Sequence, residues 1–296
     1  MKKYMLTCES TVDIYKEELE ELDVPYINYY YYLDDEMFET NISKDYSYED
    51  FYRAIEEGKT PKTTQVNAER FVEFFTPFLE SGYDVLHLTF SSGLSGTYNS
   101  ANLAAKELNE KYQDNKVYVI DSLNGSVGYG LFLREVAQRK NIEEFTLEKL
   151  ISWIEENKLT VNHWFYTTDI SHFIKGGRVG KVEGIIGKRL NICPLMDVSV
   201  NGEIIPRYKV IGKKRVFKKA IELMEKHAFG GLNYTGKCYV THANNLEEAI
   251  RLKNEIEERF LYLEEQVKIY PAGAITASHA GPGAVGIFFF GDKRTK

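Results

Sequence analysis

The sequence predicts an α/β protein of two domains, the first built on a mostly parallel sheet and the second on a mixed sheet with antiparallel pairing. In the first half, short apolar strands alternate with helical patterns, which is typical of a parallel sheet covered by helices. In the second half, Asn201-Gly202 separates two apolar stretches and is a strong hairpin signal. The length of 296 residues is sufficient for two domains of ordinary size.

The first domain is expected to span residues 1–158. Apolar stretches predict strands at 4–7, 26–33, 85–89 and 117–120. Helical spacing and capping residues predict helices at 10–22, 47–58, 68–80, 101–111, 125–138 and 146–157. Ser10 and Asn67 are the expected N-caps of two of these helices, with Asp13 as the capping-box partner of Ser10. Between helices, residues 59–66 are expected to form a loop that carries Thr63 and Thr64.

The second domain is expected to span residues 159–296. Its predicted strands lie at 161–167, 192–200, 203–210, 238–242, 266–270 and 285–290, and its longer helices at 212–228 and 246–260. A short helix is expected between Asp169 and Gly176-Gly177. Arg178 follows it, and we expect its guanidinium to pair with a helix C-terminus or a buried carboxylate. His279 falls in a predicted glycine-rich loop before the last strand.

The turn that follows the strand at 85–89 is the most informative stretch. Residues 91–97 contain four hydroxyl side chains and two glycines. Backbone N–H groups at such a strand-to-helix turn converge on one spot and attract an anion, and glycine lets the backbone approach a ligand. Ordinary helix capping is the alternative interpretation. The turn lacks the spacing of a hydrolase nucleophile elbow, because Thr97 stands where a glycine is required, and it lacks the Gly-Lys-Ser/Thr of a P-loop.

Composition excludes several classes of function. A formal net charge of −7 and a pI near 5.6 argue against a dedicated nucleic-acid binder. Three widely spaced cysteines without a Cys-x-x-Cys pair indicate neither a zinc site nor a disulfide framework, and no His-Glu-x-x-His occurs. The N-terminus does not read as a signal peptide, and no apolar run is long enough to span a membrane. We therefore expect a cytoplasmic protein without a metal or cofactor.

The turn at 91–101, Ser-Ser-Gly-Leu-Ser-Gly-Thr-Tyr-Asn-Ser-Ala, resembles the signature of the DegV family of bacterial fatty-acid-binding proteins. Further segments resemble the family's motifs in the same order, and they are Glu9–Ile14, Thr63–Gln65, Gly176–Gly180 and His279–Ala284. The resemblance covers essentially the whole chain. Glu9 stands where the family usually has aspartate, and Ile211 where it usually has arginine.

The resemblance implies a DegV-like fold that binds a long-chain fatty acid in an apolar tunnel between two domains. It implies that Thr63, Ser95 and His279 hydrogen-bond the carboxylate, with Thr64 and Gly96 close by. Thr64 is an alternative to Thr63, and His279 is expected to donate either directly as imidazolium or through a hydroxyl as neutral imidazole.

The family resemblance also implies a non-catalytic role with a partner. The protein would hold the acid while a separate fatty acid kinase phosphorylates it, with transient contact to a membrane surface. We expect docking through residues 213–219, which are rich in lysine, although Ile211 weakens this expectation. Two other classes stay open: a serine hydrolase or acyltransferase that uses Ser95 and His279, and a binder of phosphate ligands at residues 91–97.

Overall fold

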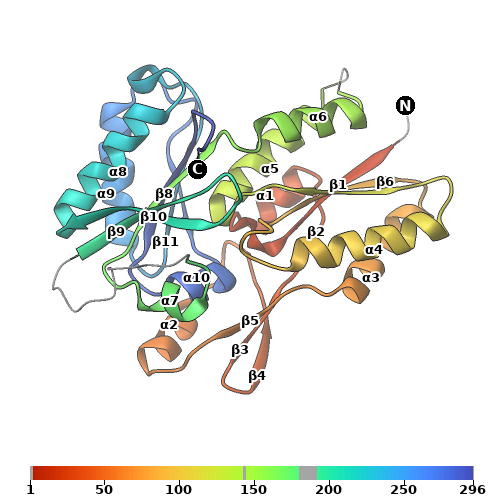
Figure 1. Cartoon of the computed structure of the whole chain (residues 1–296), viewed down its shortest axis with the longest axis horizontal. Coiled ribbons are helices and arrows are strands. Elements are labelled where there is room, and N and C mark those ends of the chain that lie inside the picture. Colours follow the sequence, from red (N-terminus) through yellow and green to blue (C-terminus); the bar gives the residue numbers. More distant parts are fainter. Residues whose placement is uncertain (1–2, 143–144, 180–191, 296) are drawn as a thin grey trace.

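A computed structural model describes residues 3–142, 145–179 and 192–295 (Figure 1). One of its sheets is parallel throughout and has four strands. In spatial order these are β2 (Tyr26–Ile27), β1 (Tyr4–Glu9), β6 (Asp84–Thr89) and β7 (Val117–Asp121). All four come from the first half of the chain, as predicted.

The largest sheet is mixed and has six strands. In spatial order these are β10 (Ile204–Ile211), β9 (Ile192–Val198), β8 (Val161–Tyr166), β13 (Val285–Phe290), β11 (Cys238–His242) and β12 (Lys268–Pro271). Neighbouring strands run antiparallel except β11 and β12, which are parallel. The predicted fold class and the hairpin around Asn201-Gly202 are confirmed, and the boundary at 158/159 stays a prediction.

A third, three-stranded antiparallel sheet was not predicted. It consists of β4 (Glu36–Glu39), β3 (Tyr30–Leu33) and β5 (Lys62–Thr64). The prediction of one strand over 26–33 is wrong, because the chain leaves the parallel sheet after β2 and pairs elsewhere. The prediction of a loop over 59–66 is wrong at β5, where Thr63 pairs with Tyr31 and Thr64 with Tyr30. Backbone pairing therefore holds both threonines in place.

The helices cover the faces of the sheets (Figure 1). They are α1 (Lys16–Glu21), α2 (Glu49–Glu56), α3 (Ala68–Glu80), α4 (Thr97–Lys111), α5 (Ser126–Lys140), α6 (Leu147–Asn157), α7 (Ser171–Gly176), α8 (Lys213–His227), α9 (Leu246–Arg259) and α10 (Ala274–Ala280), with short 3₁₀ turns η1 (Ser10–Val12) and η2 (Gly231–Asn233). The backbone N–H of Arg70 donates to the Asn67 side chain, which confirms Asn67 as an N-cap.

Two predicted helix positions need correction. A helix over 10–22 is wrong at its start, because Ser10 accepts the N–H of Tyr29 and bonds to Thr40, while Asp13 has a left-handed φ of 52° that ends η1. The loop prediction for His279 is also wrong, because His279 lies in the last turn of α10. Three of the seven α10 residues are alanine, and five of the seven residues are buried, so the helix shows no apolar period.

Helix α5 lies between the two large sheets (Figure 1). It contacts β8, β11 and β13 of the mixed sheet, and its Phe132 shares an apolar core with Leu88 of β6. A Cβ atom at Gly128 would lie 2.4 Å from Nε2 of His163 in β8. Glycine is therefore required there for the close packing of α5 against the mixed sheet.

Candidate ligand-binding site

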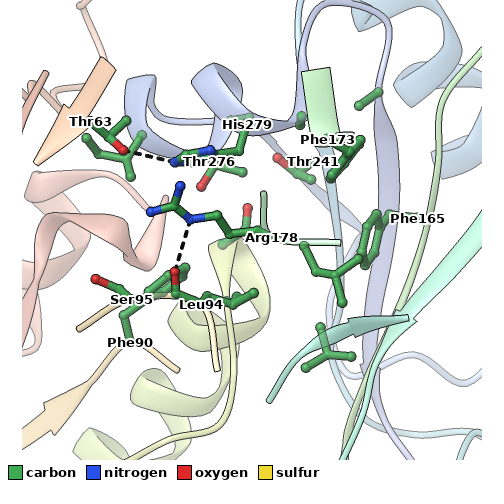
Figure 2. Close-up of a pocket in the computed structure, with 18 of the residues that line it drawn as sticks. Thr63, Phe90, Leu94, Ser95, Phe165, Phe173, Arg178, Thr241, Thr276 and His279 are labelled. Carbon is green, nitrogen blue, oxygen red and sulfur yellow. Dashed lines mark hydrogen bonds between the residues drawn. The ribbon is translucent and has the colours of Figure 1, made fainter. Parts of the chain in front are cut away.

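A cavity of about 350 Å³ lies where the carboxyl ends of the parallel strands face the mixed sheet (Figure 2). Its volume is in the range of small-molecule sites, which is about 300–1,000 Å³. Apolar side chains from both halves of the chain form much of its wall, and they include Phe90, Leu94, Phe165, Phe173, Val198, Ile204, Ile275, Val285 and Phe288. Such a wall accommodates a long apolar group.

Thr63 and His279 meet at one end of this cavity. The Oγ1 atom of Thr63 in β5 lies 2.9 Å from Nε2 of His279 in α10 (Figure 2). The neighbouring Thr64 also lines the cavity, but its hydroxyl donates to the carbonyl of Tyr30 at 3.2 Å. Between these two threonines, only Thr63 thus bonds to the imidazole in the described structure.

His279 is neutral in this environment. Burial, and to a smaller extent the positive charge of Arg178, lower the pKa of His279 to about 4. The Nδ1 atom is buried and has no hydrogen-bond partner among the described residues, and a Cβ at Gly176 would lie 2.5 Å from it. When Nε2 carries the imidazole proton and donates to Thr63 Oγ1, the hydroxyl proton of Thr63 is available to a ligand.

Ser95 belongs to a chain of hydroxyl groups at the same end. The Tyr29 phenol donates to Thr97 Oγ1 at 2.7 Å, and burial keeps the pKa of Tyr29 well above its ordinary value. Ser95 Oγ lies 2.9 Å from Thr97 Oγ1 and accepts the N–H of Thr97 at 3.3 Å. With Tyr29 donating to it, Thr97 Oγ1 can donate its own proton to Ser95 Oγ, and the hydroxyl proton of Ser95 is then available to another acceptor.

Two further predicted residues complete this end. A Cβ at Gly96 would lie 2.2 Å from Oε1 of Gln65, so a larger residue at this position would displace the Gln65 side chain. Arg178 donates to the carbonyl of Gly176 at 2.5 Å, which confirms the predicted pairing with a helix C-terminus, here that of α7. Arg178 also lines the cavity and donates to Leu94 O at 3.4 Å (Figure 2).

The first part of the turn at 91–97 is not an anion site, and that prediction needs correction. The N–H groups of Leu94 and Ser95 donate to the carbonyl of Ser91, and the N–H of Ser92 donates to the Asp121 carboxylate. The hydroxyl of Ser91 donates to Gly202 O at 2.8 Å. This part of the turn therefore holds the β9–β10 hairpin, and the nearby Asp121 charge opposes a phosphate ligand.

The geometry also counts against a serine hydrolase. Ser95 is bonded to Thr97 and His279 to Thr63, so the imidazole is not paired with the serine as a general base. With a pKa near 4, His279 is a weak base at neutral pH. Its Nδ1 lacks the carboxylate partner that orients the imidazole of a triad.

The cavity is also lined by residues that were not predicted as site residues, among them Gln65, Ser126 and Thr276. Asp13, taken for a helix-capping residue, instead binds the last two. Its Oδ2 accepts the hydroxyls of Ser126 at 2.6 Å and Thr276 at 2.7 Å. The sequence carried no signal for these contacts, because the burial of Asp13, which makes its carboxylate require partners, is a property of the folded chain.

Metal chemistry finds no support in the described ranges. No group of three or more His, Cys, Asp or Glu side chains there is arranged to hold a metal ion. Cys8, Cys193 and Cys238 are buried free thiols. Within the same ranges, no helix is long and apolar enough to cross a membrane.

The fold and the cavity define an α/β protein with an internal ligand-binding site. The model of the DegV family, described as uncharacterised proteins, matches residues 3–292, and the chain belongs to this family. It is 33% identical over 288 residues to a fatty acid-binding protein of Thermotoga maritima, covering 96% of each chain. It is also 33% identical over 294 residues to a DegV domain-containing protein of Clostridium perfringens, covering 99% of each.

Solved structures of relatives have the same fold. A DegV lipid-binding protein from Thermotoga maritima superposes with a TM-score of 0.82 at 30% identity, over 99% of this chain and 100% of that one. DegV of Bacillus subtilis, described as a fatty acid binding protein, gives a TM-score of 0.85 at 26% identity, with the same coverage.

Proposed function

We propose that this protein binds a long-chain fatty acid in the cavity, with its carboxylate held by Thr63, Ser95 and His279. The observation that carries the proposal is the convergence of two hydroxyl donors at one end of an apolar cavity. Thr63 is oriented by His279, and Ser95 by Thr97. The fatty acid or lipid binding named for relatives supports a binding role rather than catalysis.

The binding free energy of a fatty acid requires both the apolar wall of the cavity and its polar end. Burial of about 14 methylenes at about 0.8 kcal/mol each contributes up to about 11 kcal/mol. Desolvation of the carboxylate offsets much of this gain unless hydrogen bonds replace water. Neutral His279 acts through Thr63, and the nearby Arg178 guanidinium supplies the positive charge that complements the acid.

The head-group end is the part of the cavity that is closest to solvent. Gln65, Gly96 and Arg178 are exposed, and Thr63 and Ser95 are partly exposed. An acid bound with its carboxylate at this end would stay accessible to a second protein. We infer a non-catalytic partner role, in which a fatty acid kinase phosphorylates the bound carboxylate in the cytoplasm.

The proposed docking surface includes the N-terminal half of α8. Together with β10, this helix borders a groove of about 580 Å³, lined by Arg207, Tyr208, Lys209, Val210, Ile211, Arg215, Lys218, Lys219 and Glu222. Ile211, where the family usually has arginine, is 60% exposed beside these cations. The basic side chains favour an acidic partner surface, and Ile211 contributes apolar area in place of a charge.

Native mass spectrometry of the purified protein tests the binding function. A co-purifying acid of about 14–20 carbons, released by denaturation, is the expected result. A phosphorylated small molecule in its place would favour the phosphate-binding alternative. Hydrolysis of an acyl ester that is abolished in Ser95→Ala would favour the hydrolase alternative.

A further inference from the structure

The cavity contains a second pair of hydroxyls with the opposite hydrogen-bonding character. Ser126 at the start of α5 and Thr276 in α10 both line it. Each bonds to the same oxygen, Oδ2 of Asp13, at 2.6 and 2.7 Å. An ionised carboxylate is an acceptor only, so both hydroxyls must donate to Asp13. Their lone pairs are then what they offer to the cavity.

Asp13 is held firmly in this role. Its side chain is 5% exposed, and its backbone has the left-handed φ of 52° that directs it between α5 and α10. Gly273 leaves room for it, because a Cβ there would lie 2.5 Å from Oδ1. The phenols of Tyr48 and Tyr52 are the other titratable groups nearby, and both stay neutral because burial raises their pKa values.

The position of this acceptor pair relative to the head group follows from α10. Thr276 precedes His279 by one helical turn, and Figure 2 shows the two side chains next to each other on the cavity wall. Side chains three residues apart on a helix have Cβ atoms about 5–6 Å from each other. A ligand carboxylate held at Thr63 and His279 therefore brings its second and third carbons close to Thr276.

The geometry points to a subsite for a hydroxyl group on the ligand, formed by Ser126 and Thr276, so that the preferred ligand class is the 3-hydroxy fatty acids. This inference rests on the proposed function, because the carboxylate must first lie at Thr63 and His279. A ligand hydroxyl donates to the acceptor pair, whereas a second anion is repelled by Asp13. The same pair thus favours one orientation of the ligand.

The test is a titration of delipidated protein with palmitic acid and 3-hydroxypalmitic acid at pH 8, where Asp13 is ionised. We expect the hydroxy acid to bind about threefold to tenfold tighter, the gain of one net hydrogen bond. 16-Hydroxypalmitic acid, with the hydroxyl at the far end, should bind no tighter than palmitic acid. Tighter binding of palmitic acid than of its 3-hydroxy derivative by the wild type overturns the inference.

Variants separate the subsite from general damage. Thr276→Val and Ser126→Ala should abolish the preference for the 3-hydroxy acid, while Thr276→Ser keeps the preference. Thermal unfolding checks that each variant is folded. Retention of the preference in both Thr276→Val and Ser126→Ala overturns the inference with the proposed function intact. Failure of the wild type to bind either acid overturns both.

Discussion

Thr63 Oγ1 lies 2.9 Å from Nε2 of His279, although 216 positions separate the two residues in the chain. This contact joins β5 to α10 and closes the polar end of the cavity. It also determines what each group can do: a neutral imidazole that donates to the threonine leaves the threonine proton for the ligand. In the proposed function, His279 acts on the bound acid through Thr63.

Two amide variants test which ring nitrogen of His279 makes the functional hydrogen bond. His279→Gln places an N–H near the position of Nε2 and should keep fatty-acid affinity within about threefold. His279→Asn places its amide near the position of Nδ1 and should weaken binding about tenfold, as the loss of one hydrogen bond to a charged ligand predicts. Equal losses in the two variants would contradict a functional hydrogen bond at Nε2.

Nitrogen NMR of histidine side chains tests the charge of His279 directly. Because burial lowers its pKa to about 4, the ligand-free protein should show a neutral imidazole between about pH 5 and pH 8. An imidazolium signal for His279 at pH 7 would be contrary to the proposed relay.

Gly176, the last residue of α7, and Gly177, which follows it, offer a matched comparison. Gly176→Ala should weaken fatty-acid binding, because its Cβ would lie 2.5 Å from Nδ1 of His279 and displace the imidazole. Gly177→Ala should leave affinity unchanged, since nothing lies within 4 Å of the added Cβ. The φ of 66° at this position should make the folded variant less stable than the wild type by about 1 kcal/mol. Calorimetric titration and thermal unfolding measure the two effects. The opposite pattern would show that the imidazole position does not control binding.

Asp13 should make stability depend on pH. Burial raises the pKa of Asp13 to about 6, above its ordinary value of 3.8, so the folded state binds the proton more tightly than the unfolded state. The associated stabilisation is fully present below about pH 4 and is lost as pH rises through about 6. It amounts to about 3 kcal/mol for about two pKa units.

Urea unfolding of the wild type and Asp13→Asn at pH 4, 5, 6 and 7 measures this linkage. The difference between the two isolates Asp13 from other titrating groups, His279 among them. The stability of the wild type relative to the variant should increase as pH falls from 7 to 4. A difference in unfolding free energy that does not change with pH would mean that the pKa of Asp13 is not raised in the folded state.

Charge reversal tests the proposed docking surface. Lys218→Glu with Lys219→Glu should lower the rate of acyl-phosphate formation by a fatty acid kinase about tenfold at low salt, since long-range attraction speeds association. Fatty-acid affinity should not change. The control reverses Lys106 and Lys111, exposed on α4. An unchanged kinase rate in the Lys218→Glu, Lys219→Glu variant would show that the groove beside α8 is not the docking surface.

Strong local patterns in the sequence predicted most of the fold. Alternation of apolar strands with helices gave the parallel sheet, and Asn201-Gly202 gave the hairpin. The small sheet was missed because Tyr30–Leu33 continues the apolar run of β2, so no local signal separates two strands that pair with different partners. Helix α10 was missed because it is short and buried on several sides, which removes the helical period.

The residues of the site were easier to predict than their chemistry. Motifs brought Thr63, Ser95 and His279 together as candidates, and the structure places all three on one cavity. The direction of each hydroxyl proton depends on partners that are distant in sequence, such as Tyr29 for Thr97 and Asp13 for Thr276. These contacts exist only in the folded chain, so composition and spacing carry no signal for them.

The central claim is that Thr63 and Ser95 donate to the ligand carboxylate, and a fatty-acid titration of delipidated Thr63→Val and Ser95→Ala tests it most directly. Ser152→Ala, exposed on α6, is the control. Loss of one donor to a buried charge should cost about 1.5–3 kcal/mol, which is roughly tenfold to a hundredfold in affinity. If both variants bind like the control, with unchanged stability to unfolding, the carboxylate lies elsewhere and the assignment of the site is wrong.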